Sequence, residues 1–409
     1  MPNSQKKIKV HSLTGRITLK LMCEAFQAVK RNRGAAGIDK VSIQMFEANF
    51  LENIQALMRD LKKGSFEPLP LRRVFIPKDD GSQRPLGIPA VRDRVAQEVV
   101  RRLLNPIFEP LFHGSSFGFI QGRNCHMALE AVLQLHEQGF RHVLDADIKG
   151  FFDNLLHPVI MKAVAAEVAD GNILRLVEKF LKAGVMENGV FKPTTIGTPQ
   201  GGVISPLLAN IVLNHLDWQL HKAGYRFARY ADDFVVVCTS EAQAKEALTL
   251  VQRVLENELS LKLSPEKTRI TTYGKGYSFL GFVLSVRSRN IRPKSAKKFK
   301  DKVRELTVRK QNLDAEVILK LNRVIRGTAQ YFATSFSTCR ERFHKLDSWI
   351  RMRLRSMKYK RRCLNDNKKM RVKVFARLGL LSLESFCDAC QRTPKGSSPG
   401  APLLGSPGA

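Results

Sequence analysis

Two adjacent aspartates, Asp232 and Asp233, lie between the apolar arms of the stretch 227–237, Phe-Ala-Arg-Tyr-Ala-Asp-Asp-Phe-Val-Val-Val. Arms of this composition are typical of strands, so the stretch predicts a hairpin with two carboxylates at or near its turn. A second acidic strand is predicted about 80 residues upstream, in His142-Val-Leu-Asp-Ala-Asp147, where alternation places both acids on one face. Aspartate is also common in solvated turns, so the hairpin alone does not establish chemistry.

Carboxylates that converge from two strands are suitable ligands for a pair of Mg²⁺ ions. Mg²⁺ prefers oxygen ligands and keeps open positions for water and phosphate. Two such ions can activate an attacking hydroxyl group and stabilise the leaving oxygen of an in-line phosphoryl displacement. The pattern therefore points to nucleotidyl transfer.

The composition indicates a polyanionic partner. The chain has 409 residues, is 44% hydrophobic and carries a formal net charge of +31, so it can form two or three compact domains with real cores. Nucleic acid is the first candidate for the partner and an anionic membrane surface the second. No apolar run approaches the roughly 20 residues of a transmembrane helix, and the N-terminus lacks an apolar signal core. We expect a soluble protein of the bacterial cytoplasm or nucleoid.

The seven cysteines are odd in number and mostly scattered, which predicts reduced thiols. Cys387 and Cys390 form one C-x-x-C pair. A zinc site would need a second pair of Cys or His ligands nearby, and none follows in the sequence. We therefore expect no metal at this pair.

The elements expected before the first acidic strand include a helix and a basic hairpin. One helix is predicted over about 43–63, ending at Gly64. The stretch 71–89 predicts two short strands around an Asp80-Gly81 turn. This hairpin carries four cations, which are Arg72, Arg73, Lys78 and Arg84. They could form a solvated sheet edge, or they could clamp a triphosphate beside a metal site.

Three further positions have both a structural and a functional interpretation. Phe151 and Phe152 could be core residues, but an aromatic just beyond a metal-binding strand could also exclude a ribose 2′-hydroxyl by bulk. The glycines of the loop 197–206 could bring backbone close to a ligand at the start of a helix. Lys267 could be a surface charge, or it could protonate a leaving pyrophosphate.

The composition changes beyond Leu284. Residues 287–312 hold eleven Lys or Arg against two acids, and residues 351–377 hold twelve against one. Balanced surfaces mix charges of both signs, so these helical stretches predict contact with a phosphate backbone. The final residues, 393–409, are rich in Gly, Pro and Ser and are predicted to be disordered.

Six ordered blocks together resemble the reverse transcriptases encoded by group II introns and their relatives. The blocks are Ile76-Pro-Lys78 with Arg84-Pro-Leu-Gly-Ile-Pro89, Asp147-Ile-Lys-Gly-Phe-Phe-Asp153, Thr198-Pro-Gln-Gly-Gly-Val-Ile-Ser-Pro206, Tyr230-Ala-Asp-Asp233, Glu266-Lys-Thr268 and Phe279-Leu-Gly-Phe282. The resemblance covers roughly residues 13–380. Because the blocks occur in order, the set is far more specific than any single member.

The resemblance implies an α+β right-hand polymerase, with fingers and a palm built from an antiparallel sheet plus helices, and an α-helical thumb. It implies four regions along the chain: an N-terminal extension and the start of the fingers over 1–70, fingers and palm over 71–285, a thumb similar to the maturase X region over 286–365, and a basic C-terminal segment with its tail over 366–409.

The resemblance also implies a role for individual residues. It makes Asp147, Asp232 and Asp233 the metal-binding carboxylates, with the Ile148 carbonyl as a further ligand. Lys78 and Arg84 match residues that hold the triphosphate, Phe152 the gate against ribonucleotides, Gln200 a residue beside the incoming nucleotide, and Lys267 a general acid. Asp145 matches no such role and is expected to be structural.

The function so implied is RNA-directed DNA synthesis: extension of a DNA or RNA primer with dNTPs on an RNA or DNA template, with two Mg²⁺ ions for which Mn²⁺ can substitute. The alternative is a maturase that binds and folds its host group II intron RNA for splicing; a duplex-binding scaffold is a weaker third reading. Only about 30 residues follow the matching region. We therefore expect no HNH endonuclease, and either an endonuclease-lacking intron protein or a domesticated enzyme of DNA repair or phage defence.

Overall fold

The computed structural model describes residues 9–77, 83–198 and 201–392. These residues form two compact units that divide between Thr272 and Tyr273. The first unit combines antiparallel sheet with helices and the second is mainly helical, so the predicted α+β class is confirmed. Across these ranges, none of the helices has the length and apolarity that crossing a bilayer would require.

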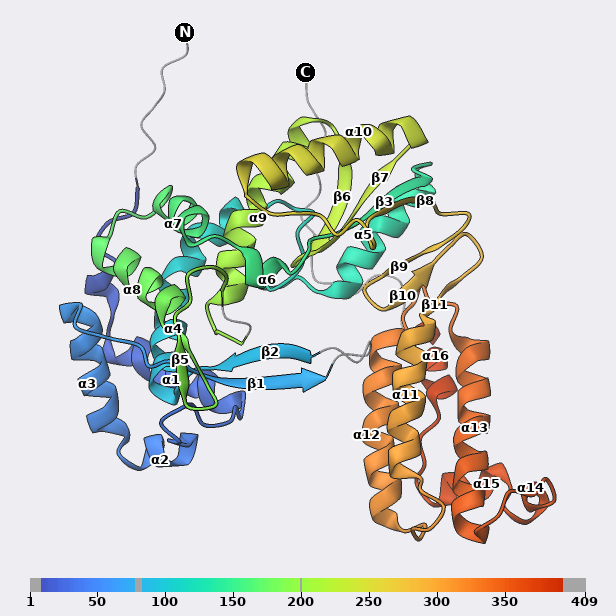
Figure 1. Cartoon of the computed structure of the whole chain (residues 1–409). Coiled ribbons are helices and arrows are strands. Elements are labelled where there is room, and N and C mark those ends of the chain that lie inside the picture. The colour runs from blue at the N-terminus through green and yellow to red at the C-terminus, as the bar shows by residue number, and fades with distance from the viewer. Residues whose placement is uncertain (1–8, 78–82, 199–200, 393–409) are drawn as a thin grey trace. The chain divides into compact units, whose positions relative to one another are not determined.

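The first unit contains a four-stranded sheet, seen at the upper right of Figure 1. Its strands, in spatial order, are β6 (Arg226–Tyr230), β7 (Asp233–Cys238), β3 (His142–Asp147) and β8 (Arg269–Thr272), and all neighbours are antiparallel. One face joins the main hydrophobic core through Leu144, Ala146, Phe234 and Val236. Because side chains alternate along a strand, the acids of β3 and the first residue of β7 lie on the opposite face.

Three helices contact strands of this sheet: α5 (Cys125–Glu137), α9 (Ser205–Lys222) and α10 (Glu241–Gln252). They lie beside it in Figure 1. Pro206 occupies the first turn of α9, where a missing N–H costs nothing, and most of the helix is buried. The Asn124 side chain caps α5 by accepting a hydrogen bond from the Met127 N–H.

A second sheet carries the basic hairpin. Its spatial order is β2 (Gln83–Ile88), β1 (Leu71–Pro77), β4 (Val185–Glu187) and β5 (Val190–Lys192). Strands β1 and β2 pair antiparallel as far as Pro77 opposite Gln83, so the predicted hairpin is present. Its turn residues, Asp80 and Gly81, lie outside the described residues.

The remaining helices of the first unit surround the two sheets. They are η1 (Thr14–Arg16), α1 (Leu19–Arg31), α2 (Ile43–Ala48), α3 (Phe50–Lys63), α4 (Val91–Phe108), η2 (Glu109–Leu111), α6 (Phe151–Asn154), α7 (His157–Ala165), α8 (Gly171–Lys182) and η3 (Arg253–Glu258). The single helix predicted over 43–63 is two helices, because the backbone leaves the helical region at Asn49, with ψ 45°. Its end at Gly64 is as predicted, with the glycine in the left-handed region at φ 76°.

The second unit begins with a three-stranded sheet in the order β11 (Arg289–Ile291), β10 (Phe282–Leu284) and β9 (Tyr277–Phe279). Its helices are α11 (Pro293–Leu306), α12 (Ala315–Phe332), α13 (Arg340–Tyr359), α14 (Asp366–Lys369), α15 (Val372–Arg377) and α16 (Leu383–Arg392). The stretch 277–284, grouped above with the palm, lies in this unit because the Phe282 ring packs 4.9 Å from the Phe332 ring of α12.

Five cysteines outside the C-x-x-C pair have described positions. Cys23, Cys125, Cys238, Cys339 and Cys363 form no disulfide bonds. The side chain of Cys390 lies outside the described residues, as does the tail 393–409 for which disorder was predicted.

Candidate active site

The predicted acidic hairpin is present and its turn is tight. Strands β6 and β7 are joined by two residues only, Ala231 and Asp232, and Tyr230 pairs with Asp233 across the turn. Ala231 has φ 58°, a left-handed conformation that costs a non-glycine residue about 1 kcal/mol or more. The turn presents Asp232 at the tip of the hairpin, and the β3–β7 register sets Asp147 directly opposite Asp233.

A cleft of about 530 Å³ brings together residues predicted from separate motifs. The predicted site residues that line it are Arg84, Asp147, Ile148, Phe152, Asp232 and Lys267. Asp233 does not line this cleft; it lies beside Asp147, its register partner on the neighbouring strand. The remaining two, Lys78 and Gln200, lie outside the described residues.

The charges in the cleft interact with one another. The Lys267 Nζ lies 3.1 Å from the Asp147 Oδ2, so the lysine reaches into the acidic site even though its side chain is 68% exposed. Burial raises the pKa of the Asp232 carboxyl, and the charge of Asp147 raises it further, while Arg84 and Arg229 lower it. Two carboxylates at this position are therefore costly to keep charged without cations, which is the condition that favours metal binding.

The donor set suits a divalent ion but does not form a closed cage. Carboxylate oxygens on two adjacent strands are the hard ligands that Mg²⁺ prefers. Within the part of the chain that the structure describes, no three His, Cys, Asp or Glu side chains are grouped closely enough to hold an ion on their own.

The two aromatic residues after β3 have different environments. The Phe151 side chain is 2% exposed and belongs to the core. Phe152 is half-buried, packs edge-on against Phe151 with ring centres 5.1 Å apart, and lines the cleft. The Thr198 N–H donates to the Phe152 carbonyl at 2.7 Å, which ties this aromatic to the loop before α9.

Two arginines of the basic hairpin interact with groups outside the cleft. Arg72 donates two hydrogen bonds to the Ala36 carbonyl, and Arg73 lies 3.9 Å from the Glu187 carboxylate. Of the hairpin cations with described positions, Arg84 is the one that lines the cleft. Asp145, expected to be structural, forms an ion pair at 3.1 Å with Arg269 on the neighbouring strand.

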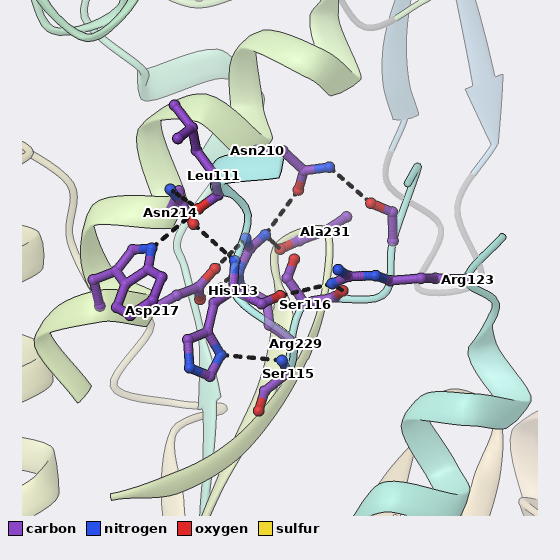
Figure 2. Close-up of polar contacts among 12 residues, drawn as sticks. Leu111, His113, Ser115, Ser116, Arg123, Asn210, Asn214, Asp217, Arg229 and Ala231 are labelled. Carbon is purple, nitrogen blue, oxygen red and sulfur yellow. Dashed lines mark hydrogen bonds and ion pairs between the residues drawn. The ribbon is translucent and has the colours of Figure 1, made fainter. Parts of the chain in front are cut away.

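Sequence reasoning missed a buried network behind the turn. The Arg229 side chain is buried and lies between Asp217, Asn210 and the Ala231 carbonyl (Figure 2). A signal was available, because Asp217 is the one acid of α9 and Arg229 lies between Ala228 and Tyr230 in a strand that leads into the acidic turn. Such charges almost always have a partner when they are buried.

Two family descriptions match the chain. "Reverse transcriptase (RNA-dependent DNA polymerase)" matches residues 76–284, and "Group II intron, maturase-specific domain" matches residues 296–375. The first match contains Asp147, Asp232 and Asp233, and the second falls within the helical unit.

Individual relatives agree with these matches. The protein YkfC of Escherichia coli (strain K12) is 36% identical over 300 residues, which are 64% of this chain and 79% of the relative. The group II intron-encoded protein LtrA of Lactococcus lactis subsp. cremoris is 32% identical over 333 residues, 64% of this chain and 54% of that protein. A telomerase structure from Candida albicans in complex with telomeric RNA has a TM-score of 0.45 at 14% identity, covering 81% of this chain and 67% of that one, a similarity too weak to carry a conclusion.

The two family matches and the identity to YkfC lead to one assignment, and the acidic hairpin, the cleft and the helical unit agree with it. The chain belongs to the reverse transcriptase and maturase family of group II introns and their relatives.

Proposed function

We propose that the protein is an RNA-directed DNA polymerase that extends a primer 3′-hydroxyl with dNTPs on an RNA template. The observation that carries this proposal is the shared cleft, in which Asp147 and Asp232 lie with Arg84 and Phe152. A protein that only binds RNA gains nothing from acids that face a polyanion, because like charges repel. A polymerase requires those acids.

Each side chain of the cleft has a distinct task in this mechanism. A bound pair of Mg²⁺ ions supplies charge neutralisation and an activated hydroxyl group at the primer end. Asp147, Asp232 and Asp233 are the residues that would bind them, and the Ile148 carbonyl would be a further ligand. Arg84, whose fork suits phosphate oxygens, binds the triphosphate together with Lys78. Positioning and electrostatic stabilisation provide most of the rate in such transfers.

Lys267 is suited to the last proton transfer. Its Nζ is already 3.1 Å from Asp147, so the ammonium group lies at the edge of the reacting centre. An ammonium there can donate a proton to the leaving pyrophosphate, which is the role proposed for it. Gln200 is proposed to lie beside the incoming nucleotide.

The test of the proposal is primer extension on a defined RNA template with dNTPs. We expect the wild-type protein to extend the primer in Mg²⁺, to lose activity completely when the metal is chelated, and to regain it when Mg²⁺ or Mn²⁺ is added back. RNA binding is followed in parallel by fluorescence anisotropy. A protein that binds the primer–template tightly but extends no primer in either metal would show that the polymerase function is wrong.

The helical unit is proposed to bind the nucleic-acid backbone. Lys297 and Lys298 are exposed neighbours on α11, and a cleft of about 640 Å³ in the same unit is lined by Arg351, Arg355 and Arg361. Backbone contacts release counterions, so the affinity falls steeply with salt. This predicts that the double variant Lys297→Ala/Lys298→Ala reduces the slope of log affinity against log salt by about 1.5 to 2.

The slope is measured by anisotropy titration between 50 and 300 mM salt. The matched control is Lys245→Ala, an exposed lysine of α10 in the other unit that pairs with Glu241. It should leave the slope unchanged. An unchanged slope in the α11 double variant would place the RNA contacts elsewhere.

Maturase activity is the second candidate function. The observation that favours it is the match of residues 296–375 to the maturase-specific domain. A maturase should bind a folded group II intron RNA more tightly than an RNA duplex of equal length and should accelerate its splicing at low Mg²⁺. Equal affinity for the two RNAs, without any effect on splicing, would argue against this function. The polymerase and maturase functions are compatible within one chain.

A further inference from the structure

Arg229 forms a buried ion pair with Asp217 directly behind the acidic turn. The Arg229 Nε donates to the Asp217 Oδ1 at 2.8 Å and the Nη2 to the Oδ2 at 2.5 Å, so the pair is bidentate. Both side chains are 1% exposed. Because Asp217 is on α9 and Arg229 is on β6, the pair fixes the strand to the helix.

The same guanidinium group contacts the turn itself. The Arg229 Nη1 donates to the Ala231 carbonyl at 2.9 Å and to the Asn210 Oδ1 at 2.9 Å, as Figure 2 shows. Asp232 is the next residue after Ala231. Any rotation of the Ala231–Asp232 peptide unit therefore breaks a buried hydrogen bond to a charged donor, which is among the stronger kinds of hydrogen bond.

The loop that contains Phe117 and Gly118 also packs against the turn. The Asn210 amide donates to the Gly118 carbonyl at 2.7 Å, and the Phe117 N–H donates to the Arg229 carbonyl at 2.8 Å. A Cβ atom on Gly118 would lie 2.4 Å from the Ala231 nitrogen, so the loop backbone rests directly against the turn. The left-handed Ala231 is thus held at its carbonyl by Arg229 and packed beside its nitrogen by the Gly118 backbone, and such a conformation persists where its surroundings over-determine it.

The charge of Arg229 is not needed for stability alone. Replacing a buried ion pair with apolar residues of similar volume is often neutral or stabilising, because both charges must lose their hydration. An apolar pair would fill the same space but could not bind the Ala231 carbonyl. The hydrogen bond to the Ala231 carbonyl is therefore a reason for a charged residue at this buried position.

We propose that Arg229, oriented by Asp217 and Asn210, is a positioning residue that holds the Ala231 carbonyl and so fixes where Asp232 presents its carboxylate. The inference rests on the proposed polymerase function for its effect on rate. Its effect on the backbone of the turn is independent of that function.

The test separates positioning from stability with three variants. In Arg229→Met, Asp217 is left buried without its partner, and the thermal midpoint should fall by about 10 °C. In the double variant Asp217→Leu/Arg229→Met, the midpoint should return to within about 4 °C of wild type. Trp218→Phe is the matched control, since Trp218 is beside Asp217 on α9 and its indole N–H donates to the Leu111 carbonyl, away from the turn.

Two readouts are compared in the double variant. Hydrogen exchange in peptides covering 227–237 should be faster than in wild type and in Trp218→Phe, because the turn is no longer fixed. The kcat for primer extension should fall by about 10- to 100-fold with the KM for dNTP nearly unchanged, as expected for a misplaced reacting group. In the single variant Arg229→Lys, kcat should likewise stay below the wild-type value, since one ammonium group cannot bind Asp217, Asn210 and Ala231 together.

The outcomes are distinguishable. A stable double variant with wild-type exchange in 227–237, or with wild-type kcat, would overturn the positioning role and leave Arg229 a purely structural residue. If the wild-type protein extends no primer, the polymerase function fails. The exchange measurement then still decides whether Arg229 fixes the turn.

Discussion

Replacement of Asp232 by asparagine is expected to reduce primer extension by at least about a thousandfold, which is about 4 kcal/mol of lost transition-state stabilisation. Asparagine keeps the shape of the side chain but removes its charge, and a neutral amide oxygen is a much weaker ligand for Mg²⁺ than a carboxylate. Burial already raises the pKa of Asp232, so the charged form in the wild type depends on nearby cations. Removing the charge should therefore relieve local repulsion and leave the fold intact.

The measurement is single-nucleotide incorporation on an RNA template, with RNA affinity and thermal midpoint recorded for every variant. Asp145→Asn is the matched control. It removes an acid from the same sheet, and its carboxylate pairs with Arg269 rather than lining the cleft. We expect this control to stay within about threefold of wild type, because a partly exposed ion pair contributes little. Equal losses in the two variants would indicate a general effect of acid removal and would contradict the specific role of Asp232.

The parts of the fold that were predictable are those encoded by local patterns. The apolar arms around Asp232 and Asp233 specified a hairpin, and the Asp-Gly turn between two apolar runs specified the pair β1 and β2. Gly64 ended its helix in the left-handed conformation, as its position predicted. Each of these features depends on residues within about ten positions of one another, where periodicity and turn chemistry act directly.

Features set by distant contacts could not be predicted in the same way. Strands β4 and β5 have three residues each, too few for alternation to be recognised. The strands of 277–284 pack on α12 through Phe282, a partner about 50 residues away, so their sequence did not show which unit they join. Helix 43–63 breaks at Asn49 without any proline or glycine to mark the position.

The candidate site shows the same division. Its acids could be proposed from spacing, but that Asp147 opposes Asp233 follows from the register of β3 with β7, a tertiary property. Arg72 and Arg84 are both cations of the basic hairpin, yet Arg72 binds the Ala36 carbonyl while Arg84 lines the cleft. The Arg229 network was not predicted because its proposed role depends on a hydrogen bond to the Ala231 backbone carbonyl. Backbone partners of a side chain cannot be identified from residue types alone.

Replacement of Phe152 by alanine is expected to reduce discrimination against ribonucleotides by about 100-fold. The ring lines the cleft that contains Asp147 and Asp232, while its neighbour Phe151 is buried in the core and supports it edge-on. The backbone at this position is fixed by the hydrogen bond from Thr198, so the ring cannot simply withdraw from an incoming sugar. If Phe152 has the proposed role of a gate, its phenyl ring would occupy the volume that a 2′-hydroxyl needs, and a methyl group would leave that volume open.

The quantity to measure is the ratio of kcat/KM for dCTP to kcat/KM for CTP, opposite guanine on an RNA template. In the alanine variant this ratio should fall, mainly because kcat/KM for CTP increases, while kcat/KM for dCTP changes little since the dCTP complex loses only packing. Phe151→Leu is the control: a core substitution of the adjacent aromatic should lower the thermal midpoint and leave the ratio unchanged. A ratio that stays at the wild-type value in Phe152→Ala would mean that sugar selection is made elsewhere in the cleft.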